Sequence, residues 1–162
     1  MITDRRRVEL AVIPMAFCRI AGMVLDDTVA CGMYERPEDH PELWEAAHLL
    51  GRAAAMALGD GVGDDKAVKL CRRTQRMVNN IMADRRGILA AYRYAQRLLI
   101  ELLESERLVL YAGSDFERGY ELLESAILSE PDNAAALDEI DRSAAKAARK
   151  TLARLEREGV FA

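Results

Sequence analysis

Apolar residues recur every three to four positions along most of the chain, the spacing of one face of an α-helix. The first such segment runs from about Asp4 to Ala30 and ends at Gly32, a residue type that commonly terminates helices. Apolar side chains cover well over half of its circumference, and Pro14 within it predicts a kink. Its polar strip is narrow and consists of Glu9, Arg19, Asp26 and Asp27. We expect such a helix to be enclosed, either at the centre of its own bundle or against another subunit.

Proline and glycine positions mark the start and end of the next helices. Asp39-His40-Pro41-Glu42 has the spacing of a capping box with proline in the first turn, and it predicts a second helix that ends before Gly59–Gly63. A third helix starts near Asp64 or Asp65. Its predicted inner face consists of Leu70, Cys71, Thr74, Met77, Val78 and Ile81.

The helical pattern breaks at residues 84–87, and a fourth helix follows that ends at Ala112-Gly113. A single long helix that is kinked at Gly87 fits the pattern nearly as well, because an interior glycine costs only about 1 kcal/mol. Ser114-Asp115-Phe116-Glu117 is a Ser-x-x-Glu capping box that opens a fifth helix to about Leu128. The last helix begins at Glu130-Pro131 and ends at Gly159.

Composition supports the same fold class. Ala, Leu, Arg, Glu and Lys make up 84 of the 162 residues, about the share that is typical of long helices. The content of 51% hydrophobic and 31% charged residues argues against a disordered chain and against a membrane-embedded bundle. The length fits one domain. We therefore predict an all-α, single-domain bundle of five or six helices over residues 1–162, with the first helix central.

Cysteine usage and the N-terminal segment bear on location. Cys18, Cys31 and Cys71 lie far apart without the spacing of a zinc site or of a disulfide framework, which favours reduced thiols in a cytoplasm. Three arginines before an apolar stretch imitate a secretion signal, but Glu9 and Pro14 interrupt that stretch. We predict a cytoplasmic, bacterial-type protein with no membrane segment.

No arrangement of residues typical of a reaction centre is present. Glu45 and His48 have the Glu-x-x-His spacing of di-iron bundles, but such a site needs the motif twice and the chain has only two histidines. Cys71 has no histidine near it in sequence and is interpreted as a small buried hydrophobe. Gly59–Gly63 lacks the Gly-Lys-Ser/Thr ending of a phosphate loop. We expect no catalytic residue, no metal site and no cofactor.

Charge is strongly segregated along the chain. Residues 64–97 carry nine bases and three acids, a net charge of +6, whereas residues 98–142 carry three bases and twelve acids, a net charge of −9. On the third helix the bases form one stripe opposite the apolar face. The bases of this stripe are Lys66, Lys69, Arg72, Arg73 and Arg76, and Asn80 extends it.

Three interpretations of this stripe stay open at the level of sequence. The stripe can be a solvated surface or lie against the chain's own acidic helices, which contain Glu101, Glu104, Glu117, Glu121 and Glu124. It can bind nucleic acid, although a pI near 5.3 counts against a nucleic-acid-binding domain. It can also dock an acidic protein partner, whose approach it would steer.

The absence of a reaction centre favours a non-enzymatic helical interaction or adaptor protein. The alternative is a small nucleic-acid-binding regulator that uses the basic stripe of residues 66–76. Self-association as a homodimer is also expected, because the first and fourth helices both have wide apolar faces.

Overall fold

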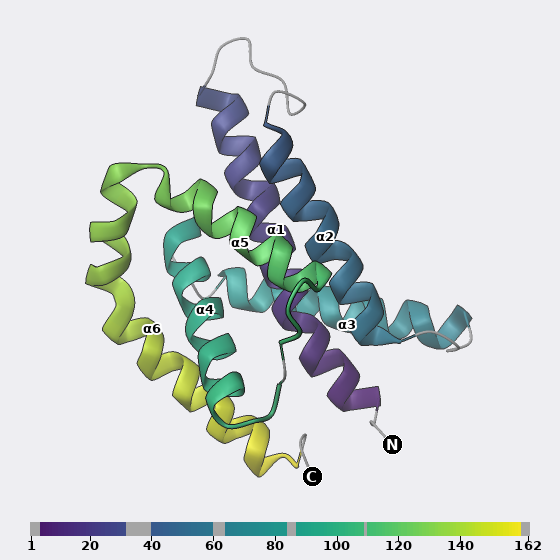
Figure 1. The fold of residues 1–162 in the computed structure, drawn as a ribbon. Helices are drawn as coiled ribbons and strands as arrows, with labels where there is room; N and C mark the ends of the chain where they lie inside the picture. The colour runs from purple at the N-terminus through teal and green to yellow at the C-terminus, as the bar shows by residue number, and fades with distance from the viewer. Residues whose placement is uncertain (1–3, 32–39, 60–63, 84–86, 109, 160–162) are drawn as a thin grey trace.

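The computed structural model describes residues 4–31, 40–59, 64–83, 87–108 and 110–159. These residues form six α-helices and, within those ranges, no strand (Figure 1). The helices are α1 (Asp4–Cys31), α2 (Pro41–Leu58), α3 (Asp64–Ala83), α4 (Ile88–Glu104), α5 (Asp115–Leu128) and α6 (Pro131–Arg157). The prediction of an all-α bundle is confirmed.

Helix α1 lies at the centre of the bundle, as predicted. It packs against α2, α3, α4 and α5. Its side chains are buried or half-buried on nearly all sides between Val8 and Leu25, which agrees with an apolar pattern that covers most of the circumference. Helices of the same chain therefore cover α1, and no second subunit is needed to enclose it.

Phe17 of α1 is the focus of an aromatic cluster in the core. Its ring meets Tyr92 of α4 edge-on at 6.0 Å between centroids, and it meets Tyr120 of α5 edge-on at 5.3 Å. Phe116 packs against both Phe17 and Tyr120. Edge-to-face pairs of this kind contribute beyond the area they bury. The cluster thus joins α1 to α4 and α5, two consecutive helices from the second half of the chain.

Helices α4 and α6 are held together by buried apolar residues and by a set of polar contacts. Asp141 of α6 accepts hydrogen bonds from Arg93 Nε at 2.7 Å and from Arg97 Nε at 2.6 Å. The hydroxyls of Tyr94 and Thr151 share a hydrogen bond of 2.6 Å. These contacts fix the register of α6 along α4.

Two helix starts test the capping predictions. Ser114 caps α5 as predicted, because its hydroxyl accepts a hydrogen bond from the Glu117 backbone N–H at 3.2 Å. The capping box predicted at the start of the second helix is wrong. The N-cap of α2 is His40, whose side chain makes no capping hydrogen bond, and Asp39 lies outside the described residues.

Helix α4 ends well before Ala112-Gly113, its predicted end. The sequence pattern continues to Leu110, but the helix stops at Glu104 and Glu106 adopts a left-handed φ of 59°. Its N–H bonds to the Leu103 carbonyl, and the Arg107 N–H bonds to the Leu102 carbonyl. These two bonds form a Schellman motif with glutamate at the position usually taken by glycine, a helix end that apolar spacing does not reveal.

Helices α3 and α4 are separate, which decides between the two alternatives left open by the sequence. The N-cap of α4 is Gly87, whose φ of 84° is incompatible with a continuous right-handed helix. In Figure 1, α3 runs across the direction of α1 while α4 turns away from it. The axes of α3 and α4 therefore point in different directions.

Candidate functional site

Among the described residues, helix α3 has a larger share of exposed side chains than the other helices have. It packs mainly against α1, and Thr74 and Val78 are its buried side chains among those described. Its other described side chains are exposed: Asp65, Val68, Lys69, Cys71, Arg72, Arg73, Gln75, Arg76, Asn79 and Asn80. Figure 1 shows the N-terminal end of α3 extending beyond α2. Among the described side chains of α3, Thr74 and Val78 therefore attach the helix to the bundle, and the others lie in solvent.

We call the predicted stripe on α3 the α3 basic face, and its residues are Lys66, Lys69, Arg72, Arg73, Arg76 and Asn80. Its described side chains point into solvent. Lys69, Arg72, Arg73 and Arg76 are exposed, Asn80 continues the same stripe, and the side chain of Lys66 lies outside the described part of the structure. The four described cations form no ion pair with any other described residue.

The interpretation that this face lies against the chain's own acidic helices has no contact to support it. Helix α3 makes no contact with α5 or α6 in the described residues and touches α4 only slightly. The acidic residues Glu117, Glu121 and Glu124 belong to α5. In the described residues α5 contacts α1, α2 and α6 and does not contact α3. The interpretations that remain are a solvated face, nucleic acid and an acidic partner.

Several other arginines of the chain hold helices together through ion pairs. Arg97 donates hydrogen bonds from two of its nitrogens to the Asp141 carboxylate, and these bonds lower the pKa of that carboxyl. On the opposite side of the bundle, Arg52 of α2 pairs with Asp115 of α5 at 3.3 Å. Arg118 of α5 pairs with Glu45 of α2 at 3.3 Å. The arginines that join two helices are therefore paired with carboxylates, whereas the described cations of the α3 basic face are not paired with any described residue.

The prediction that Cys71 is a buried hydrophobe is wrong. Its side chain is exposed on the flank of α3, next to Val68, which is 48% exposed. The helical wheel places Cys71 at the edge of the apolar side, and α3 packs against the bundle through so narrow a contact that the edge stays in solvent. The side chains of Leu70, Met77 and Ile81 lie outside the described part of the structure.

The Glu45-x-x-His48 motif lies on an exposed side of α2. Both side chains are exposed, and Glu45 is used in the ion pair with Arg118. No group of three or more His, Cys, Asp or Glu side chains in the described ranges is arranged to hold a metal ion. The motif therefore has the surroundings of a solvated polar surface.

A polar network that the sequence did not predict lies between α4 and α5. Gln96 donates to the Tyr120 hydroxyl at 2.6 Å and to Glu124 at 3.4 Å, and Arg93 donates to the side-chain oxygen of Gln96 at 2.6 Å. Burial raises the pKa of both Tyr92 and Tyr120. A tyrosine with a raised pKa is ionised to a smaller fraction near neutral pH, so less of its reactive phenolate form is present. The network is therefore suited to fixing helix positions.

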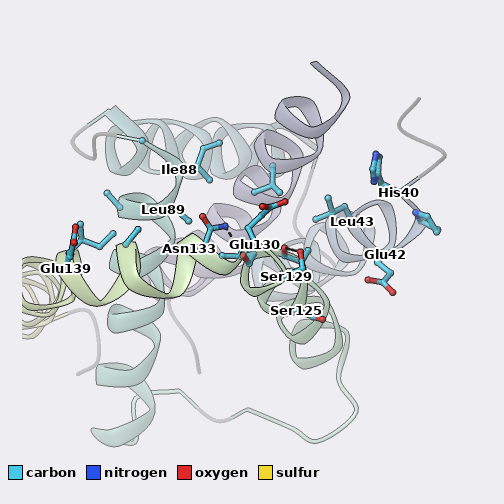
Figure 2. Close-up of a pocket in the computed structure, with 18 residues that line it drawn as sticks. His40, Glu42, Leu43, Ile88, Leu89, Ser125, Ser129, Glu130, Asn133 and Glu139 are labelled. Carbon is cyan, nitrogen blue, oxygen red and sulfur yellow. Dashed lines mark hydrogen bonds between the residues drawn. The ribbon is translucent and has the colours of Figure 1, made fainter. Parts of the chain in front are cut away.

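A broad cavity lies where the ends of α1 and α5 meet the starts of α2, α4 and α6, with a volume of about 1100 Å³ (Figure 2). Its apolar part includes Leu43, Ile88 and Ile140. The titratable residues among its lining are Glu42, Glu130 and Glu139, together with His40. Sequence reasoning missed it because five different helices contribute to it. Asn133, the residue best placed to fix a ligand, already donates to the Ile127 carbonyl.

None of the helices in the described structure combines the length and the apolar character needed to cross a bilayer. No family model, curated protein or solved structure matches the chain. The function of the protein is therefore inferred from the geometry of its own residues.

Proposed function

We propose that this chain is a non-enzymatic helical interaction protein that binds the phosphate backbone of nucleic acid through the α3 basic face. The observation that carries the proposal is the row of exposed cations on α3, which have no ion pair with any described residue. From Lys69 to Asn80 the face extends about 16 Å at 1.5 Å per residue.

The arrangement costs the folded protein stability unless an anion binds. Lys69 and Arg73, and likewise Arg72 and Arg76, are like charges four positions apart on a helix, which destabilises the helix by about 0.2–0.5 kcal/mol per pair. Phosphate groups next to the face would relieve this repulsion and release counterions into solution. A polyanion is therefore the chemical class of partner that fits the face.

Nucleic acid fits the face better than an acidic protein does. The cores of protein–protein interfaces are depleted in Lys, Glu and Asp, and their anchors are aromatic residues, Met or an Arg in well-packed surroundings. The stripe from Lys69 to Arg76 contains cations without an aromatic residue between them. Phosphate backbones, in contrast, are bound by charge and hydrogen bonds alone.

The acidic total charge of the chain is compatible with local binding of a polyanion. Most acids of the segment 98–142 lie on α4, α5 and the first half of α6, and in the described residues α3 makes no contact with α5 or α6. Exposed charges farther apart than a Debye length, about 8 Å at physiological ionic strength, are largely screened from one another. The field next to α3 therefore depends mainly on its own cations.

A cytoplasmic location and self-association as a dimer belong to this proposal as well. The location is supported by three cysteines without disulfide or zinc spacing. The dimer has less support than the sequence suggested, because α1 and the apolar residues Leu98, Leu99 and Leu102 of α4 are covered within the chain. Its remaining support is the charge complementarity between segments 64–97 and 98–142.

The test is binding of a fluorescently labelled oligonucleotide, as a single strand and as its duplex, across a salt series. We expect affinity that falls steeply with salt, and a variant with Arg72→Gln, Arg73→Gln and Arg76→Gln that binds far more weakly. In this variant the slope of log K against log salt should shrink by roughly 2 to 3 on duplex, at about 0.9 for each phosphate that the protein no longer neutralises.

The matched control carries Arg52→Gln, Arg118→Gln and Arg154→Gln, which remove the same number of positive charges from paired positions. Equal weakening in both variants would mean that only net charge matters and would overturn the assignment to α3. Poly-L-glutamate serves as an acidic polypeptide probe. Binding of polyglutamate through α3 without binding of the oligonucleotide would replace nucleic acid by an acidic protein partner.

A further inference from the structure

Helix α6 has a second exposed row of cations. Between residues 142 and 157 it carries six bases and one acid. Five of the bases recur at helical spacing on the side opposite its buried residues, and all five are exposed. We call them the α6 basic face: Arg142, Lys146, Arg149, Lys150 and Arg157. Figure 1 shows α6 along the outside of the bundle, where it packs mainly on α4.

The members of the α6 basic face form no ion pair with any other described residue. The sixth base, Arg154, projects to another side of the helix and pairs with Glu158 at 3.1 Å. The one acid between residues 142 and 157, Glu156, pairs with Arg107 at 3.8 Å. The one acid within this stretch of α6 is therefore paired with a residue outside α6.

The helix dipole accounts for only part of this row. A cation near the C-terminus of a helix is favourable, but the effect is confined to about the last turn. Arg157 lies in that turn, whereas Arg142 and Lys146 lie more than two turns before the end of α6. Arg142, Lys146 and Lys150 also follow one another at intervals of four, which places like charges side by side.

We propose that the α6 basic face is a second contact for the phosphate backbone of nucleic acid, separate from α3. This inference rests on the proposed function and extends it to a site near the other end of the chain. From Arg142 to Arg157 the row covers about 22 Å, which equals the length of about six base pairs of duplex.

The residues that surround the cations of the α6 basic face favour nucleic acid as the partner. Its neighbours on the same side are small or polar, such as Ser143 and Ala153. A membrane-surface helix needs large apolar side chains to enter the bilayer, and a protein interface needs an apolar or aromatic anchor. Neither feature accompanies the cations of α6. A phosphate backbone requires only the charges.

The experiment compares four proteins in the oligonucleotide salt series: the wild type, the triple α3 variant, a triple α6 variant and the two combined. The α6 variant carries Arg142→Gln, Lys146→Gln and Lys150→Gln, which keep a helix propensity close to that of Arg and Lys. We expect it to lower the salt slope on duplex by about 0.9 for each phosphate left without a cation, and the combined variant to show the sum of both reductions. The control is again the Arg52, Arg118 and Arg154 triple variant.

Different results of this experiment would contradict the α6 contact and nucleic-acid binding through α3. If the α6 variant binds like the wild type while the α3 variant no longer binds, the α6 contact is wrong and the proposed function stands. If the wild type binds no oligonucleotide at low salt, both are wrong. If the α6 variant binds polyglutamate more weakly but binds the oligonucleotide as before, the partner class of α6 is wrong.

Circular dichroism of each variant guards against a misfolded protein. Should the triple α6 variant lose helicity, the single reversal Lys146→Glu replaces it. We expect this reversal to weaken oligonucleotide binding, since Lys146 lies within the α6 basic face. Unchanged affinity in Lys146→Glu would overturn the α6 contact.

Discussion

Gly119 of α5 lies so tightly against Leu50 of α2 that a Cβ atom on Gly119 would be 2.8 Å from Leu50 Cγ. The same Cβ would be 3.2 Å from the Ala46 carbonyl oxygen and from Leu49 Cβ. Leu50 is fully buried and cannot swing away. Backbone and core atoms thus surround the position, which makes the absence of a side chain at residue 119 a requirement of the α2–α5 contact.

We predict that Gly119→Ala destabilises the protein by about 1–3 kcal/mol, the usual cost of overpacking a core. Urea denaturation followed by circular dichroism measures it. The control is Gly22→Ala in α1, where the new Cβ meets nothing within 4 Å. That variant should gain up to about 1 kcal/mol from helix propensity. If both variants gain stability, the close packing of α5 on α2 is wrong.

Glu106 provides a second test, at the end of α4. Its φ of 59° is costly for a residue with a side chain, by about 1–2 kcal/mol, whereas glycine adopts it freely. We predict that Glu106→Gly raises the free energy of unfolding by roughly 1 kcal/mol. Glu104→Gly, inside the last turn of α4, should lower it by about as much. A loss of stability in Glu106→Gly would contradict the Schellman motif.

Asp141 gives a pH-dependent prediction. Hydrogen bonds from Arg97 and the charge of Arg93 outweigh desolvation and hold the pKa of its carboxyl below the usual range. Because the pKa in the folded state is the lower one, the pair contributes stability above the unfolded-state pKa of about 3.9, and this contribution is lost as the pH falls through the folded-state pKa.

We therefore expect Asp141→Asn to destabilise the protein by about 1.5–3 kcal/mol near neutral pH, the range for hydrogen bonds to charged groups. The difference from the wild type should shrink in denaturation curves measured below about pH 4. Asp138→Asn is the control, because Asp138 is 83% exposed and lies 4.0 Å from Arg93. An effect of Asp141→Asn that is equally large at acid pH would show that packing and not charge is responsible.

The two described thiols should react at different rates. Burial raises the pKa of the Cys18 thiol, which also donates to the Ala47 carbonyl at 3.3 Å, whereas Cys71 is exposed. Since the thiolate is the reactive form, we predict that an aromatic disulfide reagent modifies Cys71 quickly and Cys18 only slowly at neutral pH. A Cys31→Ser background leaves these two cysteines for comparison. Equal rates in the native state would place Cys18 outside the bundle.

The predicted dimer should depend on salt. With α1 covered by its own chain, the attraction between copies comes from the +6 and −9 segments, and salt screens surface charges of this kind. We expect light scattering to give a mass above 18.1 kDa at low salt and that of the monomer at high salt. A dimer that resists salt would indicate an apolar interface, and a monomer at every salt concentration would remove self-association from the proposal.

Apolar spacing and capping residues determined the helices because both act locally. The period of 3.6 residues predicted five or six helical segments, and the Ser114 box predicted the start of α5, which depends only on atoms three residues apart. The wide apolar face of α1 predicted its central position, since a helix of that kind has no stable place at the surface. The row of cations on α3 likewise follows from helical spacing alone.

Tertiary structure decided everything that depends on which helices meet. Helical spacing placed Cys71 next to the apolar side, but its exposure follows from how narrowly α3 rests on α1. The pairing of Asp141 with Arg93 and Arg97 joins residues more than 40 positions apart, and no local pattern predicts it. The absence of ion pairs between the described α3 and α6 cations and other described residues is of the same kind, because a charge becomes available to a partner only when no helix of its own chain brings an opposite charge within reach.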